Sequence, residues 1–566
     1  MAANLRQLMR RKTMLWNDRS SFEPHWRDLS NFFLPRNGRF FTADKSRGAK
    51  RHNHIIDNEA TLAVNILDAG MMSGASSPAR PWFRYKVADH ELMRNHEVRD
   101  WLHESAQICH DILNGGNTYD SLHGVYRNLA VFGTAPTIVL PDFENVIHHY
   151  PVAIGQYAIA QDYRGNVDTF YREMSMTVAQ MAQAFGEDKL SVNTKNKLTN
   201  KNIDDLVTVI HAIERRENRN YEKVDDVNMP WQSCYFELSE GNEEGKPLRE
   251  SGFKEFPVLC PRWDLEAEDV YGSSPGMLAL GDNRQLQHQQ KAKGHAINLL
   301  LDPPLQVPSS IKNKDIDSLP GGRNYYDQMT GAGGGIRPLF EVGPSIQPMS
   351  QDMDEVRVRI RRALHTDMFL LLANSVDQEK TATEAAILDE EKRMVLGPVL
   401  NRLHRELLGK LAVKVFEEAL KNGALPPVPA DLIGMDLSVE FVSTLAQAQK
   451  LIGLGVIDRL IGTVTSLGAI KPEAFDKLDA DEIVDEYAHR LGVPPKQIVP
   501  TGKLRKVREA RSRALAAKEQ NEMANTQADT ANKLSKSPTG PGQRNALMDL
   551  NNLNSNYAIP SAVETG

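Results

Sequence analysis

Apolar residues recur at near-helical spacing at the start of the chain and predict helices there. The run from Leu5 to Leu34 ends at Pro35, with Asn37-Gly38 as a stop; its apolar members are Leu8, Leu15, Trp16, Phe22, Trp26, Leu29 and Phe33. A further helix is predicted from Asn58 to Met72, where Gly70 begins an exit rich in Gly, Ser and Pro. Its small residues favour close packing.

The pattern changes between about Ala135 and Phe256. Short runs rich in Val, Ile, Tyr and Thr are broken by turn residues, the clearest being Thr137–Leu140, Val207–Ile213 and Ser233–Leu238. These runs are typical of strands, while the flanking segments are helical. The sequence therefore predicts a mixed α/β (α+β), helix-rich chain.

Two helices separated by an insertion follow. The first is predicted from about Asp282 to Leu301 and stops at Pro303-Pro304, because proline cannot donate to the helix ladder. The second is predicted from Ser350, as N-cap, to about Phe369, with an apolar stripe of Met353, Val356, Ile360 and Leu364. The Pro/Gly-rich segment between them, Pro303 to Pro348, cannot be regular helix and predicts a small appended module.

The remaining chain is again mostly helical. Thr381 to Glu384 reads as a capping box that opens a long amphipathic helix to about Lys421, with a kink expected at Gly397-Pro398. A strand from Leu437 to Val442 and further helices through Leu491 follow. From about Asn521 the chain is polar and low in hydrophobicity, which predicts disorder.

Composition narrows the functional classes. The 566 residues predict roughly three to four packing units, and 41% hydrophobic residues can bury a sizeable core. No apolar run approaches the roughly 18 to 20 residues of a membrane span, so no membrane association is expected. The net charge of −7 disfavours tight, static DNA binding. The three cysteines are expected to be reduced core residues.

Several segments resemble ligand-binding motifs, but none has the full set of residues at the required spacing. Gly241 to Pro247 lacks the Ser/Thr of a phosphate-binding loop, and Gly331 to Gly335 lacks the final glycine of a dinucleotide fingerprint. His148 and His149, near Asp142, are expected to point to opposite faces of a strand. The acidic run lacks the glycine of a calcium loop; it comprises Asp476, Asp479, Asp481, Glu482 and Asp485. No catalytic, metal or cofactor-binding residue is assigned.

Three stretches of the sequence stand out together. They are Ile55-Ile56-Asp57 through Gly70-Met71-Met72-Ser73-Gly74 to Trp82-Phe83; Tyr271 to Gly276 with Asp302-Pro303-Pro304-Leu305; and Thr381 to Glu384 with Leu396-Gly397-Pro398. In these stretches the chain resembles the portal, or head-to-tail connector, family of short-tailed bacteriophages (podoviruses). The resemblance runs from about Leu5 to Arg508 and fades in the tail.

This resemblance implies the portal fold, with wing, stem, clip and crown regions assembled as a ring around a central channel. Its mapping divides the chain as follows: 1–275 N-terminal wing, 276–302 first stem helix, 303–349 clip, 350–369 second stem helix, 370–380 channel loop, 381–425 long kinked wing helix, 426–500 C-terminal wing and crown, and 501–566 crown helix and flexible tail. The channel loop is polar.

The resemblance further implies a homododecamer at one capsid vertex that passes double-stranded DNA without sequence specificity. It implies as partners the terminase large subunit, tail adaptor and tail tube proteins, and major capsid and scaffolding proteins. The location would be the virion, after synthesis in the host cytoplasm. Residues expected to face DNA are Asn374, Ser375, Asp377, Gln378, Glu379, Lys380, Arg357 and Arg361.

Alternatives remain for the function and for individual residues. One is a metal-dependent nucleic-acid-processing virion enzyme, which rests on His52-Asn53-His54 and the acidic run near Asp481; another is a tail adaptor or internal virion protein. For Arg357 and Arg361, ion pairs with a neighbouring subunit or with Asp354 and Glu355 are favoured over contact with DNA. Trp82 and Phe83, beside prolines, are expected at a subunit interface rather than in the core.

Overall fold

The computed structural model describes two units of the chain, Met1–Gly492 and Val493–Gly566. The residues described are 5–38, 40, 54–89, 91–223, 225–238, 247–301, 305–306, 337–338, 346–369, 396–442, 454–468, 471, 478–491, 499 and 501–536. Among these, none of the helices has the length and apolar character needed to cross a membrane.

The N-terminal helices build much of the main core. They are α1 (Leu5–Arg19), α2 (Glu23–Phe32), α3 (Glu59–Ala75), α4 (His96–Gly115) and α5 (Thr118–Phe132). The first three confirm the helices predicted between residues 5 and 34 and between 58 and 72. Helix α3 packs against α5, and Arg127 of α5 donates to Asp68 of α3 at 2.7 Å. The small α3 residues Ala60 and Ala63 are buried, each 1% exposed.

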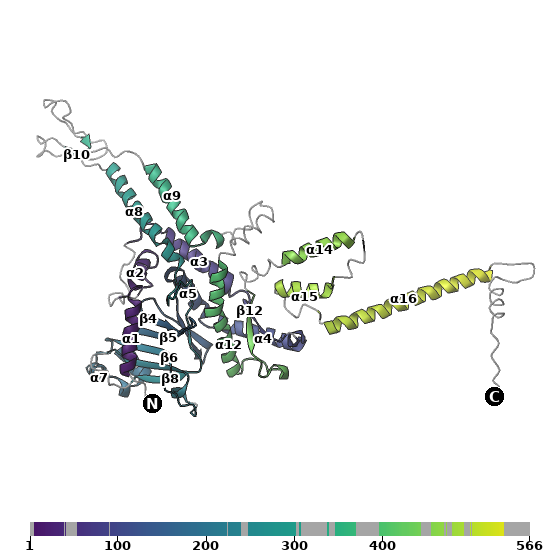
Figure 1. Cartoon of the computed structure of the whole chain (residues 1–566), viewed down its shortest axis with the longest axis horizontal. Helices are drawn as coiled ribbons and strands as arrows, with labels where there is room; N and C mark the ends of the chain where they lie inside the picture. Colours follow the sequence, from purple (N-terminus) through teal and green to yellow (C-terminus); the bar gives the residue numbers. More distant parts are fainter. Residues whose placement is uncertain are drawn as a thin grey trace, which may run out of the picture. The chain divides into compact units, whose positions relative to one another are not determined.

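A five-stranded antiparallel sheet forms the second layer (Figure 1). Its order is β4 (Tyr157–Gln161), β5 (Val167–Thr177), β6 (Leu206–Arg215), β7 (Trp231–Glu237) and β8 (Arg249–Phe253). Because side chains alternate along a strand, Ile210 and Ala212 face α1 while Val209 faces α6 (Val178–Phe185) and the following helix, α7 (Val192–Thr199). The sheet is therefore covered on both faces, and the predicted α+β region is confirmed.

Two smaller sheets join distant parts of the chain. Strand β2 (Thr137–Asp142) lies between β3 (Val146–Pro151) and β9 (Val258–Leu259). Strand β1 (Phe83–Val87) pairs antiparallel with β12 (Leu437–Phe441), more than 300 residues later. The predicted strand at 437–442 is thus confirmed, and it returns the C-terminal part of this unit to the N-terminal core.

Trp82 and Phe83 belong to the core of the single chain, which corrects the expectation of a subunit interface. Their exposed fractions are 1% and 0%. The Trp82 indole N–H donates to Tyr119 Oη at 3.2 Å. The rings of Trp82 and Phe83 pack edge to face, with their centroids 4.5 Å apart. Pairing of β1 with β12 covers this position, a contact that no local pattern could reveal.

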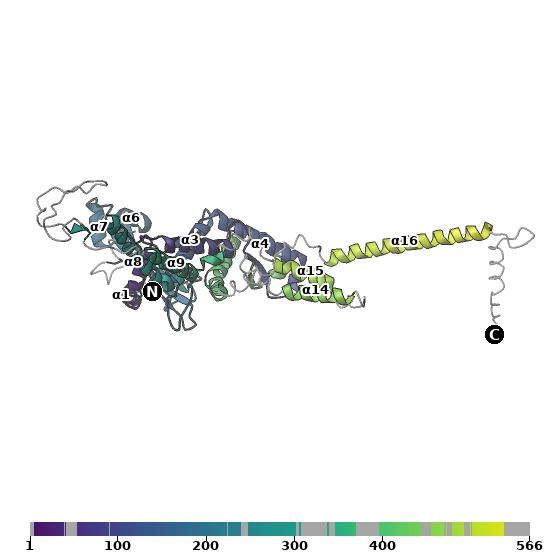
Figure 2. The same cartoon turned by 90° about the horizontal axis from the view of Figure 1, so that it is seen from above.

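The long helices α8 (Pro275–Leu301) and α9 (Ile346–Ala363) lie side by side in both views (Figures 1 and 2). The two-residue strands β10 (Leu305–Gln306) and β11 (Arg337–Pro338) pair beyond their ends. Helix α9 begins four residues before the predicted N-cap Ser350, because Pro348 is tolerated in a first helical turn. It ends near His365, whose φ of 53° breaks the helical path.

The C-terminal elements are also helical. Residues 396–403 lead through a π-helical turn, η6 (His404–Leu408), into α12 (Gly409–Lys421). Helices α14 (Leu454–Gly468) and α15 (Ala480–Leu491) follow. In the second unit α16 spans Thr501–Lys536, so the disorder predicted from Asn521 is wrong as far as Lys536. Many of these residues are good helix formers, and a helix needs no buried face to satisfy its own backbone.

Candidate functional site

The paired helices α8 and α9 correspond to the two stem helices expected from the family resemblance. The turn before α8 fixes this helix to the core. Ser274 Oγ accepts the Met277 N–H at 3.1 Å and donates to the Val131 carbonyl at 2.7 Å. Pro275 then opens the helix, where its missing N–H costs nothing. One serine therefore caps α8 and ties it to the end of α5.

Two glycines let this turn approach α5 closely. Gly133 has a φ of +76°, and a Cβ there would lie 2.0 Å from the Gly272 carbonyl oxygen. A Cβ at Gly276 would lie 2.9 Å from the Val131 backbone. The motif Tyr271 to Gly276 is thus explained by backbone contact: only glycine fits where two chains touch.

Polar side chains clamp the inner part of α8 to the segment before α3. Gln287 is 5% exposed; its Oε1 accepts the N–H groups of Ile56 (2.6 Å) and Asp57 (2.8 Å), and its Nε2 donates to the Asp57 carbonyl at 2.9 Å. Asn283 donates to the Phe32 carbonyl at 3.0 Å. Buried amides with these bonds satisfied fix the helix in one orientation.

Helix α9 packs through the predicted stripe. Met353, Val356, Ile360 and Leu364 are each 0% exposed, which confirms the prediction. Contacts of Gln289 with Asp352 and of Arg359 with Asp282 (3.1 Å) show that the two helices run antiparallel. At the base, a Cβ at Gly70 of α3 would lie 2.2 Å from the Phe369 ring. The pair is therefore anchored at its base by α3 and α5.

The two arginines expected to face DNA carry intramolecular partners. Arg357 bonds Asp57 at 2.7 Å and Asp354 at 2.6 Å, and these carboxylates raise the pKa of its guanidinium. Arg361 lies 3.7 Å from Glu59. The ion pair of Arg357 with Asp354 is the one that helical spacing indicated, whereas Asp57 and Glu59 were not foreseen.

Several predicted features lie outside the described residues. They are the DNA-facing positions Asn374, Ser375, Asp377, Gln378, Glu379 and Lys380, the capping box Thr381 to Glu384, the glycine loops at 241–245 and 331–335, and His52, Asn53 and Asp476. Most of the insertion between α8 and α9 lies outside them as well.

The candidate metal ligands do not come together. His149 is buried while its neighbour His148 is half-buried, as alternate faces of β3 require. Burial, together with His148 and Lys414, lowers the pKa of His149 to about 4. Across the described part of the chain, no group of three His, Cys, Asp or Glu side chains could hold a metal ion. The three cysteines are free and buried, as predicted.

Comparison with known proteins decides the family. The model for the bacteriophage head to tail connecting protein family matches residues 5–499. The chain belongs to this family. A probable portal protein of Bordetella phage BPP-1 is 46% identical to this chain, over 97% of this chain and 98% of the phage protein. The portal protein of Salmonella phage epsilon15 is 40% identical, over 94% and 96%.

Solved structures similar to the connector include the neck of an empty gene transfer agent particle, at 11% identity and a TM-score of 0.33, covering 80% of this chain and 95% of that chain. The family match confirms the resemblance drawn from the sequence motifs. The connector is a structural component that joins a phage head to its tail.

One central interaction of the chain is not visible in its sequence pattern. Arg262 and Glu406 are 144 residues apart and form a buried ion pair at 2.7 Å, with side chains 1% and 9% exposed. The Arg262 backbone N–H also donates to Glu406 Oε2 at 2.9 Å. Neither residue stands in a motif, so no local signal could have paired them.

Proposed function

We propose that the connector assembles into a dodecameric ring at one capsid vertex, through which double-stranded DNA is packaged and later ejected. The observation that carries this proposal is the antiparallel pair α8 and α9. Its base is fixed in the core by Ser274 and Gln287, and its far end carries the insertion 302–345. A pair of adjacent helices is what a projecting module needs as its stem.

In this proposal the insertion is the clip. It docks the terminase large subunit during packaging, and then the tail adaptor and tail tube proteins. The α+β part of the chain is the wing, which contacts major capsid and scaffolding proteins. The ring is made in the host cytoplasm and remains in the virion. It catalyses no reaction; the family's role is structural.

Charge supports a conduit through which DNA slides. Twelve copies at −7 each give a formal charge of −84, which repels phosphates from the wall. We assign the polar segment 370–380 to the channel. Arg357 and Arg361, on α9, would add only transient phosphate contacts, because both guanidinium groups already have carboxylate partners.

A charge change in segment 370–380 tests the channel assignment. Asp377→Lys with Glu379→Lys removes two negative charges and adds two positive charges per chain, so DNA should bind the channel and the packaged DNA per particle should fall. The matched control is Glu187→Lys with Asp188→Lys, on the exposed 3-10 turn η3 (Glu187–Lys189). Equal DNA content in both particles, measured by quantitative PCR after nuclease treatment, would contradict the assignment.

A further inference from the structure

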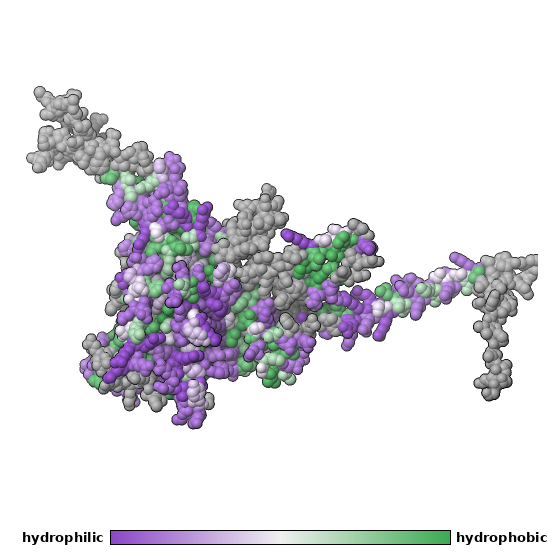
Figure 3. Space-filling view, in the orientation of Figure 1, coloured by the Kyte–Doolittle hydropathy of each residue, from purple (hydrophilic) through white to green (hydrophobic). Residues whose placement is uncertain are grey.

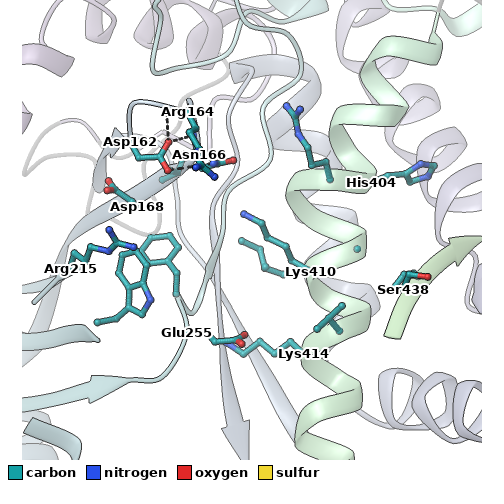
Figure 4. A pocket seen from close by; sticks show the side chains of 18 of the residues that line it. Asp162, Arg164, Asn166, Asp168, Arg215, Glu255, His404, Lys410, Lys414 and Ser438 are labelled. Carbon is teal, nitrogen blue, oxygen red and sulfur yellow. Dashed lines mark hydrogen bonds between the residues drawn. The ribbon is translucent and has the colours of Figure 1, made fainter. Parts of the chain in front are cut away.

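A cavity of about 1070 Å³ lies between α12, β12 and the hairpin turns of the large sheet (Figure 4). We call it the α12 cavity. Five cations and three carboxylates line it: Arg164, Arg215, Arg405, Lys410 and Lys414 against Asp162, Asp168 and Glu255. It is therefore a basic site on a chain whose net charge is −7.

The π-helical turn creates the basic wall. The helix contributes three pairs of neighbouring residues to the cavity wall, at positions 404/405, 409/410 and 413/414. The second pair follows the first after five residues, and the third follows the second after four. The first step follows from the bond between the Gly409 N–H and the His404 carbonyl, which spans five residues. Without the extra residue, Arg405 would not fall in line with Lys410 and Lys414.

Two features hold that turn in place. A Cβ at position 409 would lie 2.7 Å from the His404 carbonyl oxygen, so Gly409 makes the turn possible. Glu406, inside the turn, points away from the cavity to the buried Arg262. The basic wall is thus built into the fold.

The cavity's cations lack full internal neutralisation. Asp162 accepts the N–H groups of Arg164 (2.8 Å) and Asn166 (2.9 Å) within its own turn. Arg405 is 71% exposed, with Glu406 4.0 Å away. Burial lowers the pKa of Lys414 to about 8, although Glu418 and Glu255 partly oppose the shift. An anionic group that enters the cavity would therefore lie close to the ammonium groups of Lys410 and Lys414 and to the guanidinium group of Arg405.

The same chain carries a matching acidic element. Helix α15 has Asp481 and Glu482 in its first turn, and Asp479 before it accepts both of their N–H groups, at 3.1 and 3.2 Å. Val484, two residues on, is 59% exposed. An apolar groove of about 500 Å³ shares Val413, Leu437 and Val439 with the α12 cavity and could receive it. Figure 3 shows apolar surface near α12.

We propose that the α12 cavity receives the acidic start of α15 from a second copy of the chain in the ring. This inference rests on the proposed ring. A cyclic ring requires two different, complementary surfaces on every copy, and the basic cavity and the acidic helix form such a pair. A helix with side chains is about 10–12 Å wide, so the cavity volume holds about two helical turns.

Charge reversal on each side tests the pairing. Lys410→Glu with Lys414→Glu makes the cavity variant, and Asp481→Lys with Glu482→Lys makes the helix variant. We expect each to weaken ring assembly by about tenfold or more in protein concentration, because close interfacial charge pairs couple strongly. Lys189→Glu with Lys195→Glu, both exposed on the far side of the sheet, is the matched control and should assemble normally.

Mixing the two variants identifies the second copy. In an alternating ring the native acidic helix of the cavity variant meets a native cavity, and the reversed helix meets a reversed cavity, so the mixture should form rings. Light scattering and electron microscopy measure this, with circular dichroism as the check on folding.

The contrary outcomes are distinct. Rings from the variant with all four substitutions but not from the mixture would place α15 in the cavity of its own chain and overturn the proposal. Normal rings from either variant alone, or none from the mixture and the fourfold variant, would also overturn it. Failure of the unaltered chain to form rings would instead remove the proposed function itself.

Discussion

Replacing Glu406 by alanine should destabilise the larger unit by about 3 kcal/mol. The substitution leaves the Arg262 guanidinium buried without its carboxylate, and breaking a buried pair costs about 3–5 kcal/mol. The low end applies because the guanidinium keeps the Gln161 amide oxygen at 3.0 Å and the Gly165 carbonyl at 2.7 Å. In urea, a slope of about 3 kcal/mol per molar places the midpoint about 1 M lower.

The assay is equilibrium unfolding in urea followed by tryptophan fluorescence. Lys421→Met is the matched control, since it removes an exposed pair with Glu418 at 2.8 Å and should change stability by less than about 1 kcal/mol. Arg262→Met combined with Glu406→Leu should recover most of the loss, because an apolar pair leaves no buried charge. A urea midpoint for Glu406→Ala as high as that of Lys421→Met would show that the buried pair does not stabilise the fold to this extent.

Three other perturbations follow from the structure. Gly133→Ala should abolish soluble expression or lower the melting temperature, because of the positive φ and the 2.0 Å approach to Gly272. Burial lowers the pKa of His149 to about 4 in the folded chain, below the unfolded value near 6.5. The contribution of neutral His149 to the free energy of unfolding is therefore complete above about pH 6.5 and is lost as pH falls toward 4. Urea midpoints measured from pH 7 to 4.5 should fall less in His149→Gln than in the unaltered chain. Arg357→Gln should cost about 1 kcal/mol by losing Asp57, checked by thermal unfolding.

Local patterns predicted the elements of the connector well. The stripe Met353 to Leu364 follows helical spacing, and the strand at 437–442 follows from its β-branched and aromatic residues, so both were visible in the sequence. The boundary at Ser350 was wrong because a proline in the first turn does not stop a helix. The helix beyond Asn521 was missed because low hydrophobicity indicates no burial rather than no helix.

Contacts between distant residues could not be predicted. Trp82 was assigned to an interface because its covering strand comes more than 300 residues later. The pair of Arg262 and Glu406 and the π-helical turn at Gly409 depend on the packing of separate elements, and a single sequence carries no record of that packing. The same limit applies to the α12 cavity, whose lining residues come from six separate stretches of the sequence between Asp162 and Phe441.

Negative-stain electron microscopy combined with light scattering on the recombinant chain shows whether the chain assembles into the proposed ring. We expect closed rings with a central hole wide enough for duplex DNA and a mass of twelve copies. A stable monomer at all protein concentrations would contradict it.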